Sequence, residues 1–325
     1  MKSITLNRLK QWAIDTGKIW KDTVMNFMSS NPFQLAGYTA YIATFSIAPI
    51  LILIIAVFGY VIGDDMIRYK LFNELDVLIG RDSVDLLEKA IDNYQISEKK
   101  GVGTLVGIVL FLVSATTLFG IIQNSINEIW RIKVKGNIKM SIIKLLKDRL
   151  MSFGVILSLG FLLLISLVVD ASIAFLKDIL TRYLTPDFIF VAQIFNLVLS
   201  LGIITVIFSL IYRFLPDVKV YWSAAWFAGI FTSILFSVGK VIIGLIIGGN
   251  KMGAVYGAVS AFIAILGWIY YASLIFYLGV ELSRRYSLYY NHENTPSNFA
   301  IPFKITTIED EGGKDQKVKV KDCNN

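Results

Sequence analysis

Two ionisable side chains inside long apolar stretches are the residues of this sequence best suited to chemistry. Asp170 lies in Leu150–Leu176 and Lys240 in Tyr221–Gly248, and neither stretch holds another charge. An ionisable group in hydrocarbon costs about 2.5–3.5 kcal/mol on insertion scales, so such groups usually pair or serve a function. They precede the ends of their stretches by six and eight residues, or about 9–12 Å in a helix. The sequence therefore predicts an ion pair or a shared polar site at one depth.

Small and polar residues extend this candidate site along neighbouring stretches. Gln193 and Asn196 share a face of Phe188–Tyr212. In Tyr221–Gly248, small and polar residues recur at spacings of three and four and therefore share one helix face with Lys240. The set is Gly229, Ser233, Ser237, Lys240, Gly244 and Gly248. Two interpretations stay open: close packing of helices, which is the commoner use of small residues, or the wall of a hydrated substrate path. The side chain of Lys240 is also long enough to snorkel outward.

The elements that would position these residues are six transmembrane helices. A helix needs about 20 mostly apolar residues to cross the hydrocarbon core. Six stretches meet this requirement: Tyr38–Gly63, Thr104–Asn127, Leu150–Leu176, Phe188–Tyr212, Tyr221–Gly248 and Tyr256–Val280. The ten-residue alternation typical of an outer-membrane barrel is absent. With 55% hydrophobic and 17% charged residues, the sequence predicts an all-α integral membrane protein whose membrane domain covers residues 38–286.

The distribution of basic residues predicts the orientation. Basic residues exceed acidic ones in the N-terminal segment and in the second and fourth loops; the second, Glu128–Arg149, holds seven basic and two acidic residues. Such an excess is typical of cytoplasmic loops. We therefore expect both termini in the cytoplasm.

Three segments outside the six stretches have their own patterns. Residues 1–37 predict a cytoplasmic amphipathic helix on the inner membrane surface. Its apolar residues recur among lysines at near-helical spacing: Leu9, Trp12, Ala13, Trp20, Val24 and Phe27. The loop Asp64–Gly103 predicts an extracytoplasmic helical hairpin broken at Gly80. The tail, residues 287–325, is expected to be disordered.

Within the first stretch, Pro49 predicts a kink because it lacks a backbone donor.

Charged residues at the predicted inner ends of the helices form a second candidate site. They are Glu128, Arg131, Arg213 and Glu281. A cytoplasmic-side network of Glu281 with Arg131 or Arg213 is the expected arrangement, and most such clusters are structural.

No enzyme site is expected. The only histidine, His292, and the only cysteine, Cys323, both lie in the tail, so the membrane domain cannot form a histidine-based dyad or metal site. The sequence predicts no catalytic residues, no cofactor and no bound metal. Nucleic acid is not an expected partner, because the charged loops lack clustered aromatic residues for base stacking.

Several motifs, in order along the chain, resemble the YihY/BrkB family of bacterial inner-membrane proteins. The motifs are Ser125–Arg131, Tyr212–Asp217, Leu235–Lys240, Val255–Ala258, Trp268–Tyr271 and Leu278–Glu281. The resemblance runs from about Phe27 to Tyr286. It departs from the family pattern at Val280, where alanine is usual, and at Ile246, where tyrosine is common. The resemblance implies a multi-pass protein of the bacterial inner membrane. Family members were once labelled ribonuclease BN, a misassignment, and others are linked by name to serum resistance; a transport role for lipids or envelope components has been suggested.

The sequence thus supports a hypothesis of passive or secondary transport of a lipid or envelope component, with membrane lipids as partners. The alternative is a non-transporting scaffold for envelope machinery. The ribonuclease interpretation is rejected, because no buried cluster of His, Cys or carboxylate residues is expected on the cytoplasmic side. Small-residue faces also permit a homo-oligomer without requiring one.

Overall fold

The computed structural model describes residues 2–98, 117–134, 154, 186–248, 259–292, 295–297, 300–309 and 316–322. Its named helices are α1 (Lys2–Phe27), η1 (Met28–Ser30), α2 (Pro32–Ile62), α3 (Asp64–Ile79), α4 (Arg81–Glu98), α7 (Pro186–Phe214), α8 (Trp222–Gly248) and α10 (Val259–Tyr289). A further helix covers 117–129. The strands are β1 (Ile132–Val134), β2 (Ala300–Glu309) and β3 (Gln316–Asp322).

Within the described residues, four helices are long and apolar enough to cross a membrane. The spans are Pro32–Ile52, Leu197–Phe214, Trp222–Ile243 and Val259–Tyr289, which correspond to the first, fourth, fifth and sixth predicted stretches. The second predicted stretch is described only at its end, by helix 117–129, and the third only at Gly154. The helical membrane architecture is confirmed, and the total of six spans stays a prediction.

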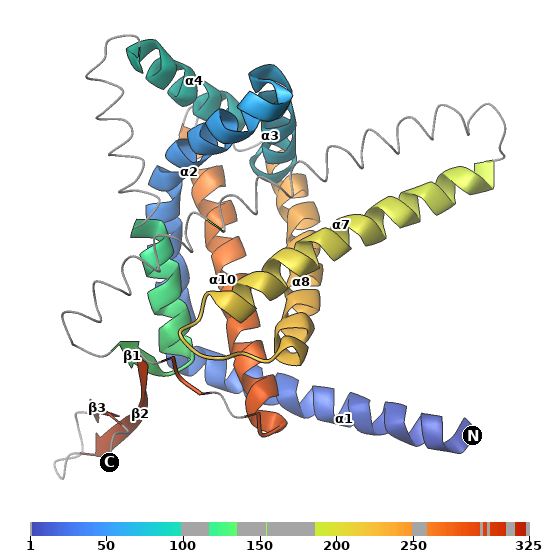
Figure 1. Cartoon of the computed structure of the whole chain (residues 1–325), viewed down its shortest axis with the longest axis vertical. Helices are drawn as coiled ribbons and strands as arrows, with labels where there is room; N and C mark the ends of the chain where they lie inside the picture. Colours follow the sequence, from blue (N-terminus) through green and yellow to red (C-terminus); the bar gives the residue numbers. More distant parts are fainter. Residues whose placement is uncertain are drawn as a thin grey trace.

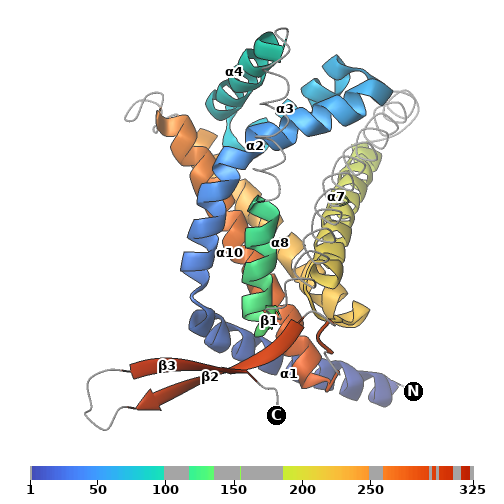
Figure 2. The same ribbon diagram turned by 60° about the vertical axis from the view of Figure 1, so that its left-hand side comes forward.

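The membrane helices form a bundle with α10 at its centre. In Figures 1 and 2, α2, helix 117–129, α8 and α10 run side by side, and α7 leans away from them. α10 contacts both α2 and α8, and α7 packs on α8. Both views show α2 bent along its length. It contains Pro49, whose missing N–H breaks the helical ladder, so the predicted kink has a cause in the structure.

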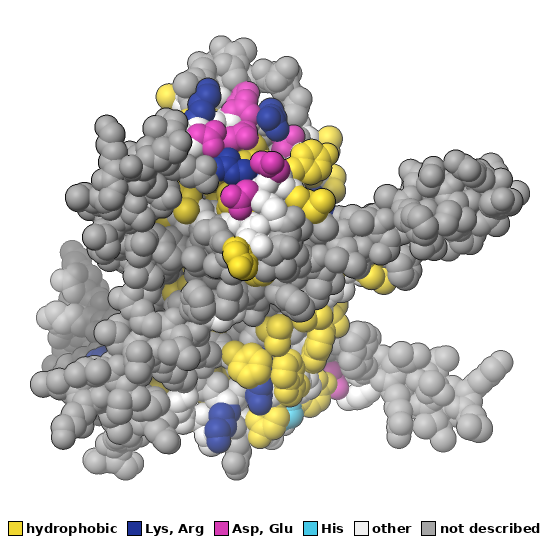
Figure 3. Space-filling model, turned by 45° about the horizontal axis from the view of Figure 1, so that its top comes forward, with side chains coloured by type: hydrophobic (Ala, Val, Ile, Leu, Met, Phe, Trp, Pro, Cys, Tyr) yellow, Lys and Arg dark blue, Asp and Glu magenta, His cyan; other side chains and the backbone are white. Residues whose placement is uncertain are grey.

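One end of the bundle is covered by α3 and α4. The side chains of Ile67, Ile91 and Ile265 belong to the hydrophobic cluster that joins these helices to α2 and α10. α3 and α4 meet at Gly80, whose φ of 80° suits glycine, as the predicted hairpin requires. Figure 3 shows acidic and basic side chains gathered over this pair. A charged surface of this kind belongs in water, which supports the predicted location outside the membrane.

At the other end, α1 crosses the bundle and packs against α10. Ile19, Thr23 and Phe27 are buried, and the ring of Trp20 lies edge-on to Phe231 at 4.2 Å. Val24, predicted to belong to the apolar face, is 48% exposed. The helix is therefore confirmed, but its buried face is a stripe with a spacing of four residues directed at the protein.

The tail departs from the prediction of disorder. β2 pairs antiparallel with β1, with Lys133 opposite Ile301, and β3 pairs with β2. The prediction was wrong here because Lys and Val alternate over residues 317–321, and a period of two is the pattern of a strand. α10 also continues to Tyr289, nine residues past the predicted end of the sixth span at Val280. The sheet and α1 lie at the same end of the molecule (Figure 2); the cytoplasmic location of both termini stays a prediction.

Candidate functional site

One face of α8, predicted as either a packing surface or a path wall, packs directly on α7. Ser233 is 1% exposed, and its Oγ lies 2.8 Å from Oγ1 of Thr205. A Cβ at Gly229 would overlap the Ser209 side chain and lie 3.0 Å from the carbonyl oxygen of Thr205. Ser237 donates a 2.9 Å hydrogen bond to the carbonyl of Ser233. At the level of Gly229 and Ser233, this face serves close helix packing.

Lys240 lies further along the same helix and is half-buried. Within the described residues its side chain has no hydrogen bond or ion pair. It precedes the end of α8 by eight residues, or about 12 Å. Beside it, Gly239 lets the ring of Tyr271 from α10 approach so closely that a Cβ would overlap it. The Tyr271 hydroxyl donates to the carbonyl of Leu235 at 3.0 Å, so α10 closes one side of the helix next to Lys240.

The remaining members of the predicted intramembrane site are not described. Asp170 lies outside the described residues, and so do the side chains of Gln193 and Asn196, although their backbone belongs to α7. The pairing of Asp170 with Lys240 therefore stays a prediction. The structure places Ser233, Ser237 and Lys240 from the predicted set.

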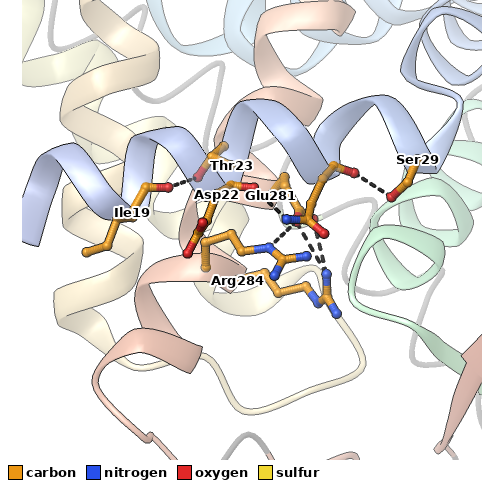
Figure 4. A network of polar contacts seen from close by, with 8 residues as sticks. Ile19, Asp22, Thr23, Ser29, Glu281 and Arg284 are labelled. Carbon is orange, nitrogen blue, oxygen red and sulfur yellow. Dashed lines mark hydrogen bonds and ion pairs between the residues drawn. The ribbon is translucent and has the colours of Figure 1, made fainter.

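The second predicted site, at the end where α1 crosses, has a rearranged set of contacts. Glu281 is fully buried and accepts hydrogen bonds from Nε of Arg285 at 2.6 Å and from Nη1 of Arg284 at 3.3 Å (Figure 4). Arg131 acts on Arg284 as a like charge. Arg213 instead lies over the ring of Trp222, 5.6 Å from its centroid. Of the described ion pairs, none joins Glu281 to Arg131 or Arg213, so the expected contact is replaced by bonds to neighbours on α10.

Glu128 is the fourth member of that predicted network. None of the described hydrogen bonds or ion pairs joins it to Glu281. It lines a cavity of about 340 Å³ with Asn124, Asn127, Lys133 and Phe303 as well as Ile132. Partial burial raises the pKa of its carboxyl above the ordinary value. Helix 117–129 lines one side of the cavity with Asn124, Asn127 and Glu128, and the strands β1 and β2 line the other.

A buried carboxylate that the sequence did not single out lies nearby. Asp217 is 1% exposed and accepts hydrogen bonds from Nδ2 of Asn127 at 2.8 Å and from Nε2 of Gln123 at 3.4 Å. Its own N–H donates to Oδ1 of Asn127 at 2.9 Å. This cluster joins helix 117–129 to the connection between α7 and α8. Its sequence signal is the spacing of four residues between Gln123 and Asn127, but nothing local identifies Asp217 as their partner.

Buried hydroxyls form a third polar element that the sequence did not predict. Tyr212 is 1% exposed; its hydroxyl lies 2.9 Å from Oγ1 of Thr232 and donates to the carbonyl of Phe276 at 3.0 Å. These contacts tie α7 to α8 and α10. On the other side of α10, the hydroxyl of Tyr277 lies 2.6 Å from Oγ1 of Thr39 on α2.

No group of His, Cys, Asp and Glu side chains suited to a metal ion occurs in the part of the chain that the structure describes.

Comparison with known proteins gives the family. A family model described as Virulence factor BrkB matches residues 23–300. A UPF0761 membrane protein of Psychrobacter sp. (strain PRwf-1) is 27% identical over 272 residues, which are 83% of this chain and 48% of that protein. Another, of Pseudoalteromonas translucida (strain TAC 125), is 27% identical over 289 residues, 86% of this chain and 87% of that protein.

The relatives differ in length. The chain spans about half the length of the Psychrobacter protein (48%) and of a similar UPF0761 membrane protein of Janthinobacterium sp. (strain Marseille) (55%). No solved structure matches the chain. The family model covers well over half of the sequence, and the relatives are membrane proteins by name. The motifs, the apolar helices and these matches together show that the chain belongs to the YihY/BrkB family of membrane proteins.

Proposed function

We propose that this protein is a passive or secondary transporter of a lipid or another amphiphilic envelope component. The observation that carries the proposal is Lys240, a half-buried amine in an apolar helix, without a hydrogen bond or ion pair among the described residues. An ammonium group in hydrocarbon needs an opposite charge close by. In this proposal, the carboxylate of Asp170 and the phosphate of a transported lipid are the two groups that supply this opposite charge to Lys240.

The surroundings of Lys240 suit a substrate that stays partly in lipid. Val238, Val241 and Ile242 flank it and are 49%, 61% and 51% exposed, so an apolar surface begins directly beside the amine. Acyl chains would remain against this surface while the polar headgroup moves past Lys240 and Ser237. Ser233 and Gly229 do not belong to such a path, because both are packed against α7.

A non-transporting scaffold is the second candidate function. The close α7–α8 contact at Gly229 and the hydroxyl bond at Ser233 favour it, because rigid packing is all that a scaffold needs from these residues. In either case we propose the bacterial inner membrane as the location, with both termini cytoplasmic and with no catalytic residues or cofactor. The charge excess in the second loop and the shared end of α1 and the sheet support this orientation.

Chemical accessibility separates the two functions. Single cysteines are introduced as Lys240→Cys, Ser237→Cys and Ser233→Cys in the Cys323→Ser protein, and intact cells or vesicles are treated with a membrane-impermeant maleimide. We expect reaction at positions 240 and 237, which a hydrated path exposes, and protection at 233. Tyr69→Cys, at a residue that is 71% exposed on α3 in the predicted extracytoplasmic hairpin, shows that the reagent reaches the protein. Equal protection at 233, 237 and 240 would rule out a hydrated path.

A further inference from the structure

Positive charge is in excess around Glu281. Its carboxylate is 0% exposed, and the side chains of Arg284 and Arg285 that bond to it are only 12% and 18% exposed. Arg131 adds a third guanidinium that acts on Arg284 as a like charge. Of the charged groups that act on Arg284, Glu281 is negative and the other two are positive. Two guanidiniums thus bond one carboxylate where water is scarce, and a third positive charge acts on one of them. Such an arrangement is costly unless an anion joins it.

The position of this cluster in the molecule identifies the source of the anion. Aromatic side chains surround the same end of the bundle: Tyr221, Trp222, Trp226, Tyr289 and Tyr290 are all exposed. The ring of Phe227 on α8 lies 4.9 Å from that of Tyr286 on α10, so the start of α8 and the end of α10 are at one level. Exposed Trp and Tyr side chains mark the headgroup level of a membrane. α1 crosses the bundle here with Lys18 and Lys21 exposed.

We propose that Arg131, Arg284 and Arg285 bind the phosphate of an anionic lipid headgroup at the end of the bundle where α1 crosses α10. Guanidinium groups present several N–H donors in a plane and bind phosphate oxygens in pairs. Glu281 holds Arg284 and Arg285 in place, which leaves donors on both for a ligand. Arg131 follows the end of helix 117–129 with φ of 56°, and none of the described ion pairs joins it to Glu281, so its donors are not held by that carboxylate.

This site is distinct from the path proposed at Lys240 and does not depend on transport. A scaffold anchored in the membrane could bind the same lipid. The basic surface of α1 would raise the local concentration of anionic lipids, since each basic residue near a membrane surface adds to that attraction.

Thermal unfolding of the purified full-length protein in detergent tests the site. Dioleoyl phosphatidylglycerol, dioleoyl phosphatidylcholine and sodium phosphate are titrated separately, because a ligand that binds only the folded protein raises its melting temperature. We expect phosphatidylglycerol to raise it, and the zwitterionic lipid and free phosphate to have little effect. A full shift from sodium phosphate alone would overturn the lipid as the source. An equal shift from phosphatidylcholine would overturn the role of net charge.

Arg131→Gln is the informative variant, since it removes surplus charge without unpairing Glu281. We expect its ligand-free melting temperature to equal or exceed that of the wild type, and its apparent affinity for phosphatidylglycerol to fall about tenfold, as the loss of one charge-assisted bond implies. Arg213→Gln, at an arginine that stacks on Trp222, is the matched control and should keep the wild-type affinity. Unchanged affinity in Arg131→Gln, or an equal loss in Arg213→Gln, contradicts the site. Native mass spectrometry of the wild type provides a second measurement, and failure to retain phosphatidylglycerol there would also contradict it.

Discussion

The hydroxyls of Thr205 and Ser233 lie 2.8 Å apart across the contact between α7 and α8. Each hydroxyl can also donate to a carbonyl of its own helix: Thr205 to Leu201 at 2.7 Å, and Ser233 to Ile230 at 2.8 Å. Because each hydroxyl carries one hydrogen, two hydrogens serve these three contacts. Four residues from Ser233, Gly229 keeps the two backbones close. Small residues and a shared hydroxyl bond are a common means of joining helices in lipid, where no hydrophobic effect drives association.

The α7–α8 contact should not tolerate a methyl group at Gly229. In Gly229→Ala the new Cβ would overlap Ser209, so we expect a loss of about 1–3 kcal/mol, as for overpacked cores. Gly202→Ala on α7 is the matched control, because nothing lies within 4 Å of its Cβ position. Thermal unfolding of both purified variants measures the effect. Equal melting temperatures would show that the contact is not tight.

The stability that the buried Asp217 cluster adds to the fold should depend on which of its side chains accepts the hydrogen bonds. In Asp217→Asn an amide replaces a carboxylate that two amide donors face, and we expect a loss of about 1–3 kcal/mol. The exchange Asp217→Asn with Asn127→Asp restores one donor and one acceptor. The double variant should therefore unfold at a higher temperature than either single variant, a coupling that a double-mutant cycle measures. Simple additivity of the two losses would contradict the direct contact.

The single variant Asn127→Asp adds a pH dependence. Two carboxylates would then lie at hydrogen-bond distance, which raises the pKa of the pair in the folded protein. Because the folded state then binds more protons than the unfolded state, stability relative to the wild type falls as the pH rises. Unfolding curves between about pH 5 and about pH 8 should show the deficit shrinking at the acid end, where the pair holds a proton. A deficit independent of pH would place residue 127 away from Asp217.

Helix positions were predictable from the sequence because lipid imposes a simple requirement. Any segment that crosses must satisfy its own backbone bonds and present apolar side chains over about 20 residues, and α2, α7, α8 and α10 meet it visibly. The break at Gly80 was equally local. Partners between helices were not predictable, since the bond between Tyr212 and Thr232 and the pairing of Asp217 with Asn127 depend on tertiary contacts.

The errors in the prediction have particular causes. The tail was expected to be disordered from its polar composition, although its alternation of Lys and Val has the period of a strand. The apolar face of α1, which includes Val24, was predicted to lie on the membrane surface, and nothing local in the sequence indicated that Ile19 and Thr23 would be buried against the protein. Arg213 was assigned to the Glu281 network by its predicted depth, but the ring of Trp222 beside it offers a nearer partner.

Loss of the Glu281 carboxylate should be strongly destabilising. Glu281→Gln leaves Arg284 and Arg285 without their anion in a buried setting, and breaking such a buried pair costs about 3–5 kcal/mol. Asp85→Asn is the control. The side chain of Asp85 is 45% exposed and pairs with Arg81, so its loss should change stability by less than about 1 kcal/mol. Denaturant unfolding of the two variants compares them, and similar stabilities would mean that Glu281 is solvated in solution.

Lipid movement in reconstituted vesicles tests the transport proposal most directly. The purified protein is placed in liposomes with a headgroup-labelled phospholipid, and an impermeant quencher measures how quickly the label changes leaflet. We predict faster exchange than in protein-free vesicles, and a rate lowered roughly tenfold in Lys240→Met and in Asp170→Asn, because each loses a charge that the proposal places on the path. Gly202→Ala should retain the wild-type rate. A wild-type rate equal to that of protein-free vesicles, or unchanged rates in both charge variants, would contradict transport along α8.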